Sequence, residues 1–179
     1  MDLRIRMECA RMNGYETHIP VLEKVLPYIH AVNVLEYGVG EASTVWLLSH
    51  GYEVTSVELN REWVKRVISV VPPKYQTAWR VHMVTDERQY VVDRHYDAVF
   101  VDGGNHLHRV PVAQMCMDSG LTDHILMHDT ESAVYRWKDL VMREGWHKAN
   151  CTLYTPWTTV LTKDAELAKM LISTMRSET

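Results

Sequence analysis

The sequence predicts an α/β protein with a doubly wound, mostly parallel sheet and helices on both of its faces. Two observations support this fold class. Apolar runs typical of strands alternate five times with segments of helical periodicity. A pair of strand-like runs then precedes a last helix. In sheets of this kind, ligands bind at the carboxyl ends of the strands, near the point where the strand order reverses.

The helices are predicted from apolar spacing and from the residues that begin or end them. Thr17 can cap the first helix, and Pro20 suits its first turn. Asn60 can cap a later helix, which Pro72 and Pro73 stop. The expected helices cover residues 17–30, 42–51, 61–71, 86–92, 111–117, 132–145 and 164–177.

The strands are predicted where apolar residues run together between turn residues. The expected strands cover residues 32–38, 52–59, 79–85, 96–104, 123–129, 146–154 and 158–164. The whole chain, residues 1–179, is long enough for a single domain with its own core. We expect an N-terminal helical segment (1–31), a core of sheet and helices (32–163) and a C-terminal helix (164–179).

The composition narrows the class of protein. Apolar residues make up 46% of the chain, which is typical of a globular protein, and the net charge of −4 comes without a basic block. Nucleic acid is therefore not an expected partner.

Cys9, Cys116 and Cys151 form no CxxC pair, which predicts free thiols in a reducing compartment. No signal peptide and no apolar run of about 20 residues is visible, so we expect a cytoplasmic protein without a membrane partner.

A glycine turn between the first two expected strands points to a ligand. Gly38 and Gly40 lie between a strand that ends near Glu36 and a helix that begins near Ser43. Glycine permits a tight turn and a close approach of ligand to backbone, and a helix start offers free amides to an anion. Glu58 ends the next strand, 20 residues after Gly38, at about the distance where dinucleotide sites place an acid on ribose hydroxyls. Together these residues predict a site for a nucleoside-containing ligand.

The motifs around these residues resemble one family. "VLEYGVGEAST" resembles the first motif of the Rossmann-type (class I) S-adenosylmethionine-dependent methyltransferases, and "VTSVELN" resembles their second strand with its ribose-binding acid. "YDAVFVDGGNH" resembles their fourth strand and the loop that follows it. The resemblance covers about residues 17–163. It implies a seven-stranded sheet in the order 3-2-1-4-5-7-6, with an antiparallel last strand.

The resemblance carries cofactor-binding roles onto matching positions. Glu58 would hold both ribose hydroxyls of S-adenosylmethionine, and Asp102 would lie beside the methyl donor. Ala42 departs from the family, because a third glycine is common at its position. The implied cofactor-binding residues are Glu36, Gly38, Gly40, Ser43, Glu58, Thr85, Asp86 and Asp102.

The acceptor is expected to be an oxygen atom of a small molecule. The "DGGN" sequence at Asp102 is not the Asn/Asp-Pro-Pro-Tyr type used to methylate amines, and what remains resembles the small-molecule O-methyltransferases. In that group a divalent metal, magnesium or manganese, is often bound after the fourth and fifth strands, which here implies Asp102 and Asp129. Thr130 stands where a third ligand is expected. The alternative is that both acids only position the substrate or cap loops.

His106 is the expected general base, with His108 as the alternative, because an imidazole can take a hydroxyl proton near neutral pH. Asp102 is the second expected catalytic residue. Two rival functions stay open. One is another transferase or an oxidoreductase on the same scaffold, and the other is a noncatalytic nucleoside-binding module. The short connections leave little chain for a lid, so the site is either open or completed by a second subunit of a homo-oligomer.

Overall fold

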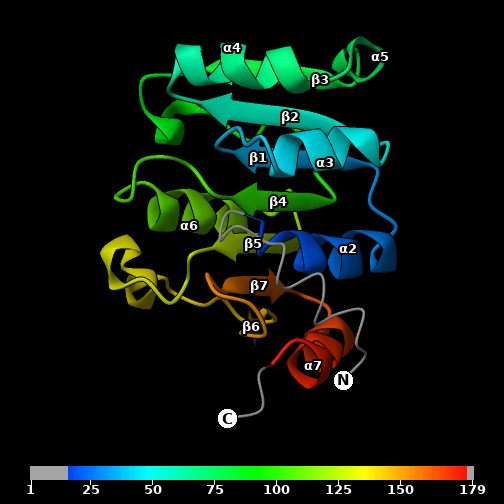
Figure 1. Cartoon of the computed structure of the whole chain (residues 1–179). Coiled ribbons are helices and arrows are strands. Elements are labelled where there is room, and N and C mark those ends of the chain that lie inside the picture. Colours follow the sequence, from blue (N-terminus) through cyan, green and yellow to red (C-terminus); the bar gives the residue numbers. More distant parts are fainter. Residues whose placement is uncertain (1–15, 177–179) are drawn as a thin grey trace.

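The computed structural model describes residues 16–176, which contain a seven-stranded sheet in the order β3-β2-β1-β4-β5-β7-β6. Figure 1 shows the strands in this order from the top to the bottom of the view. The predicted fold class and strand order are confirmed. The strands are β1 (Asn33–Tyr37), β2 (Glu53–Glu58), β3 (Trp79–Met83), β4 (Ala98–Val101), β5 (His124–His128), β6 (His147–Cys151) and β7 (Thr158–Thr162).

Strand pairing fixes where a ligand can bind. β1 pairs in parallel with β2 on one side and with β4 on the other, so the chain reverses its direction of winding at β1. β7 runs antiparallel to both β5 and β6, and its arrow points against the others in Figure 1. The carboxyl ends of β1, β2, β4 and β5 therefore meet at one edge of the sheet.

Helices cover both faces of the sheet, because alternate strand residues point to opposite sides. One buried cluster joins Val34 and Phe100 to helices α2, α3, α4 and α7, and the other joins Leu35 and Val99 to α6 and Trp137. The α-helices are α2 (Ile19–Tyr28), α3 (Ser43–Ser49), α4 (Arg61–Val70), α5 (Pro73–Gln76), α6 (Arg109–Ser119) and α7 (Ala165–Thr174).

The prediction of a helix over residues 132–145 is wrong. This segment forms only two 3₁₀ turns, Ala133–Tyr135 and Trp137–Asp139. Arg136 between them has a left-handed backbone with φ 58°, which an α-helix cannot accommodate. Only Trp137 of the expected apolar stripe is buried, whereas Val134 and Val141 are more than half exposed. The expected helix over 86–92 is likewise reduced to one 3₁₀ turn, Glu87–Gln89.

Capping predictions succeed at α4 and fail at α2. Asn60 caps α4, since its side chain accepts hydrogen bonds from the amides of Glu62 and Trp63. The cap of α2 is His18, without a side-chain hydrogen bond, whereas Thr17 makes contacts elsewhere, described below.

Two of the three cysteines lie in the described residues. Cys116 and Cys151 are buried free thiols, and burial raises the pKa of each to about 12. Cys9 lies outside the described residues. Among residues 16–176, no helix has the length and apolar character needed to cross a membrane.

Candidate functional site

A cleft of ≈ 780 Å³ lies at the carboxyl edge of β1, β2 and β4. This volume falls in the range of small-molecule and cofactor sites. The cleft is at the point where the winding reverses, as expected for a doubly wound sheet. Its lining residues are Glu16, His18, Gly38, Val39, Gly40, Glu41, Ala42, Ser43, Glu58, Asn60, Trp63, Arg66, Asp102 and Gly104.

The two glycines of the turn after β1 are required by close contacts. Gly38 has φ 94°, and a Cβ atom there would lie 2.7 Å from the carbonyl oxygen of Asp102. A Cβ atom on Gly40 would lie 2.6 Å from Oγ of Ser43. The turn therefore packs too tightly for side chains, and it presents backbone to the cleft.

Glu36 supports this turn from inside the protein. Its carboxylate is fully buried and accepts hydrogen bonds from the hydroxyls of Ser43 (2.6 Å), Thr44 (2.8 Å) and Ser56 (2.7 Å). Burial raises the pKa of Glu36 to about 7, although the three hydroxyls favour the ionised form. Glu36 and Ser43 thus brace the start of α3. The amide of Thr44 is used by the carbonyl of Gly40, so it is not free for an anion.

Glu58 faces the cleft and ties two loops together. One carboxylate oxygen accepts from the amide of Val39 (2.8 Å), and the other accepts from the amides of Leu59 (2.7 Å) and Asn60 (2.8 Å). A carboxylate offers about four acceptor sites, so three are in use. Glu58 therefore has free capacity for about one ligand hydroxyl.

An aromatic ring and an ion pair form one wall of the cleft. The indole N–H of Trp63 donates to the carbonyl of Val39, which fixes the ring beside the glycine turn. The guanidinium of Arg66 lies 4.9 Å from the centre of this ring and pairs with Glu41 at 2.6 Å. The wall combines a flat apolar surface with charged groups at its rim.

Asp102 and Asp129 are brought to the same edge, as predicted, but a cation already lies between their carboxylates. Buried Arg109 at the start of α6 pairs with each carboxylate at 2.9 Å. The same guanidinium donates to the carbonyls of Gly103 and His128, and it lies 4.0 Å from the centre of the Tyr135 ring. Because Arg109 binds one oxygen of each carboxylate, Asp102 and Asp129 together do not offer magnesium or manganese the set of open oxygen ligands that these ions prefer.

A second group of polar residues meets behind Asp102. Nδ1 of His128 lies 3.4 Å from Oδ2 of Asp102, and Nε2 lies 2.9 Å from the hydroxyl of Thr17. His18 is 2% exposed, and its ring centre lies 4.8 Å from that of His128. Burial and the neighbouring His128 lower the pKa of His18 to about 3. Burial alone would raise the pKa of Asp102, but the hydrogen bond and charge of His128 and the charge of Arg109 lower it.

The two histidines expected to act as a base lie in different surroundings. His108 is buried, and its ring binds the carboxylate of Glu87 and the side chain of Asn105. His106 is exposed on the loop between β4 and α6. Of the two, only His106 is exposed, and it is not among the residues that line the cleft.

The expected adenine-binding residues lie in the loop after β3. Thr85 is exposed, and Asp86 accepts a hydrogen bond from the amide of Arg88 and forms an ion pair with its guanidinium. Asp86 also lies 3.6 Å from Nδ1 of His108, which links this loop to the one after β4.

Sequence reasoning missed His18 and Arg109. Neither belongs to a recognisable motif, and each acts through residues distant in the chain. One signal for Arg109 was available: two acids at the ends of neighbouring buried strands need a cationic partner, and Arg109 is the arginine that follows the first of them.

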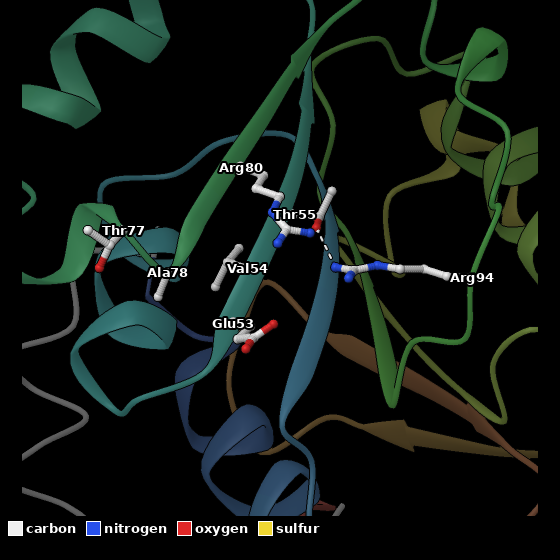
Figure 2. Close-up of a pocket in the computed structure, with 7 residues that line it drawn as sticks. All are labelled: Glu53, Val54, Thr55, Thr77, Ala78, Arg80 and Arg94. Atoms are coloured by element: carbon white, nitrogen blue, oxygen red, sulfur yellow. Dashed lines mark hydrogen bonds between the residues drawn. The ribbon is translucent and has the colours of Figure 1, made fainter.

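A second hollow lies at the opposite ends of the strands. Figure 2 shows Arg80 and Arg94 pointing toward Thr55, whose hydroxyl accepts a hydrogen bond from Arg94 at 3.1 Å. This hollow of ≈ 210 Å³ is smaller than typical cofactor sites and lies at the amino ends of β2 and β3. The larger cleft is therefore the candidate nucleoside site.

No protein-family model and no curated protein sequence matches the chain. Solved structures do match it. The O-methyltransferase TomG from Streptomyces achromogenes, in complex with SAM, is 15% identical with a TM-score of 0.61, covering 90% of each chain. A putative caffeoyl-CoA O-methyltransferase from Staphylococcus aureus is 12% identical with a TM-score of 0.64, covering 90% of this chain and 92% of its own. The N-methyltransferase NodS from Bradyrhizobium japonicum is 16% identical with a TM-score of 0.57, covering 84% of this chain and 97% of its own. The chain therefore has the fold of the class I S-adenosylmethionine-dependent methyltransferases.

Proposed function

We propose that this protein transfers a methyl group from S-adenosylmethionine to an oxygen atom of a small molecule. One observation carries the proposal: the cleft at the reversal point combines a glycine turn with a buried acid, Glu58, that keeps an unused acceptor site. A nucleoside-containing ligand needs both features, since its ribose hydroxyls donate hydrogen bonds and the part attached to the ribose lies against the backbone of the turn. The structural likeness to methyltransferases supports the same reaction class.

The residues of the cleft fit the cofactor. Gly38 and Gly40 let the turn pack closely and present its backbone to the cleft, and Glu58 can accept from one ribose hydroxyl. Trp63 provides a flat surface beside the turn. Asp102 lies at the end of β4, on the side of the cleft where the resemblance places the methyl donor. S-adenosylmethionine supplies an electrophilic methyl group bound to a positively charged sulfur.

An oxygen acceptor requires a group that takes its proton. We propose His106 as that general base, because it is the exposed histidine of the loop after β4, close in sequence to Asp102. Arg109 holds Asp102 at 2.9 Å, so Asp102 is fixed as a positioning group at the cleft wall. The protein would then mainly align acceptor and donor, which is where most of the rate gain of such reactions arises.

Calorimetry with S-adenosylmethionine and with its demethylated product tests the proposal. We expect both to bind, and we expect Glu58→Gln to weaken binding. The glutamine removes the charge of the acceptor that would face the ribose hydroxyl, so the loss should be about 1.5–3 kcal/mol. Glu166→Gln, at an exposed glutamate of α7 outside the cleft, serves as the matched control. Tight binding of a nicotinamide dinucleotide, with none of S-adenosylmethionine, would contradict the proposal.

Turnover separates an enzyme from a binding module. Purified protein is incubated with S-adenosylmethionine and a panel of phenols, hydroxy acids and carboxylic acids, and methylated products are detected by mass spectrometry. We expect His106→Ala to lower the rate by roughly 10²–10⁴-fold with an unchanged cofactor affinity. Cofactor binding without product from any acceptor would favour the noncatalytic alternative.

A further inference from the structure

We propose that His18, Asp102 and His128 bind a divalent transition-metal ion at the wall of the cleft. One ligand atom from each residue lies within 4.8 Å of the others. His18 precedes α2, Asp102 follows β4 and His128 ends β5, so the fold brings the three together from distant parts of the chain. The proposal concerns this ligand set alone and holds whether or not the protein transfers methyl groups.

The hydrogen bonds of Thr17 decide which nitrogen of His128 is free. The hydroxyl of Thr17 donates its single proton to the carbonyl of Pro156 at 2.8 Å. It must therefore accept the proton of Nε2 of His128, 2.9 Å away. With its proton on Nε2, His128 presents Nδ1 to Oδ2 of Asp102 at 3.4 Å and Oδ1 of Asp129 at 3.6 Å, where Nδ1 either carries a second proton or offers its lone pair to a metal ion. In both cases a positive charge lies between Nδ1 and the carboxylates.

His18 gives a second, independent indication. Both of its ring nitrogens are buried and have no hydrogen-bond partner among the described residues. Leaving two such groups unpaired in the interior is costly, and buried polar atoms in native proteins are rarely left so. The ring lies against Phe100 at 5.0 Å and against His128, and it lines the cleft. A metal ion bound by one nitrogen and a water or ligand on the other would satisfy both.

The surroundings match those of known metal sites. Arg109 holds Oδ1 of Asp102 at 2.9 Å, which leaves Oδ2 for the ion, and Thr17 orients His128 through its second nitrogen. Asp102 and Asp129 carry two negative charges against one on Arg109, so the group attracts a further cation. Two imidazoles with one carboxylate favour zinc, iron, cobalt or manganese over magnesium and calcium, and they leave positions open toward the cleft.

Metal titration of the purified, chelator-treated protein tests the site. We expect one zinc or cobalt ion per chain by calorimetry, with visible cobalt absorption that indicates nitrogen ligands. His18→Phe and Asp102→Asn should abolish this one-to-one binding. Thr17→Val should weaken it roughly 10–100-fold, because it removes only the group that orients His128. His147→Ala removes an exposed histidine on β6 and should bind as the wild type does.

Thermal unfolding should respond to His18→Phe in the opposite direction to metal binding, since the substitution abolishes binding but should stabilise the metal-free fold. Phenylalanine at position 18 keeps the aromatic contact with Phe100 and removes two unpaired nitrogens, so metal-free His18→Phe should unfold at a higher temperature than the metal-free wild type. Zinc should raise the unfolding temperature of the wild type and leave that of the variant unchanged. The proposal is overturned if the wild type binds no stoichiometric ion. Unaltered binding in folded His18→Phe, or equal loss in His147→Ala, would overturn it as well.

Discussion

At the scale of single residues, the ionisation of Glu36 should control part of the pH dependence of stability. Burial raises its pKa from 4.5 in the unfolded chain to about 7 in the fold. Between these values the folded protein holds a proton that the unfolded chain has released, so the free energy of unfolding falls as pH rises through this window. Above pH 7 the full cost is present, on the order of 3 kcal/mol.

Glu36→Gln should remove this dependence without breaking the hydrogen bonds. The hydroxyls of Thr44 and Ser56 already accept protons from Gly40 and Trp79, so they must donate to one oxygen at position 36, which the glutamine carbonyl can replace. Ser43 can rotate and accept from the new NH₂ group. Urea unfolding at several pH values should show the variant more stable than the wild type at pH 8 and similar at pH 4. A parallel pH profile for the two proteins would contradict the assignment.

Two substitutions at the turn after β1 can test whether close packing within the protein, without any ligand, accounts for the glycine at position 40. Gly40→Ala should destabilise the protein because its methyl group meets Oγ of Ser43 at 2.6 Å, and Glu36 holds that hydroxyl in place. In a Ser43→Ala background, the next nearest side-chain atom of residue 43 is 3.7 Å away, which is ordinary contact. We therefore expect the second substitution to cancel most of the cost of the first, as a coupling of about 0.5–3 kcal/mol in a double-mutant cycle. Additive costs would show that the turn relaxes by itself.

At the scale of elements, the sequence predicts those helix ends that are determined by residues only a few positions away. The start of α4 at Asn60 and its end before Pro72 are both set by residues within a few positions, and both are found as the sequence predicts. The segment 132–145 is decided by distant contacts instead. The indole of Trp137 approaches the carbonyl of Asp129, and Gln114 of α6 accepts from the amide of Val141. The second of these contacts ties the segment to α6, and the periodicity of the sequence predicts neither contact.

Arg136 carries the backbone strain of that segment, and this can be measured. Its left-handed conformation is unfavourable for any residue with a Cβ atom, whereas glycine adopts it freely. Arg136→Gly should therefore be more stable than Arg136→Ala by roughly 1 kcal/mol. Both variants lose the exposed ion pair with Asp139, so that loss cancels in the comparison. If alanine were the more stable, residue 136 would be helical in solution.

At the scale of the whole molecule, the sequence predicts the framework of the site but not its interior. The fold class and the turn near Gly38 follow from periodicity and from glycine and acid spacing, which are local, whereas the strand order follows from the resemblance to the class I methyltransferases. The roles of Thr17, His18 and Arg109 depend on which strand ends become neighbours, and spacing along the chain does not contain that information. The cytoplasmic location, the absence of a nucleic-acid partner and a homo-oligomeric state stay predictions.

Arg109 connects two loops at the carboxyl edge of the sheet, so its loss should lower the free energy of unfolding of the whole molecule. It binds the loops after β4 and β5 through two carboxylates, and it packs on Tyr135. Arg109→Ala would leave two partly buried carboxylates without their cation, which should lower the free energy of unfolding by about 3–5 kcal/mol. Arg143→Ala is the matched control, because its pair with Asp118 is exposed and should contribute less than about 1 kcal/mol. Urea unfolding at pH 7 measures both variants. A cost for Arg109→Ala as small as that for Arg143→Ala would show that solvent reaches Asp102 and Asp129 and that the edge is not held by this arginine.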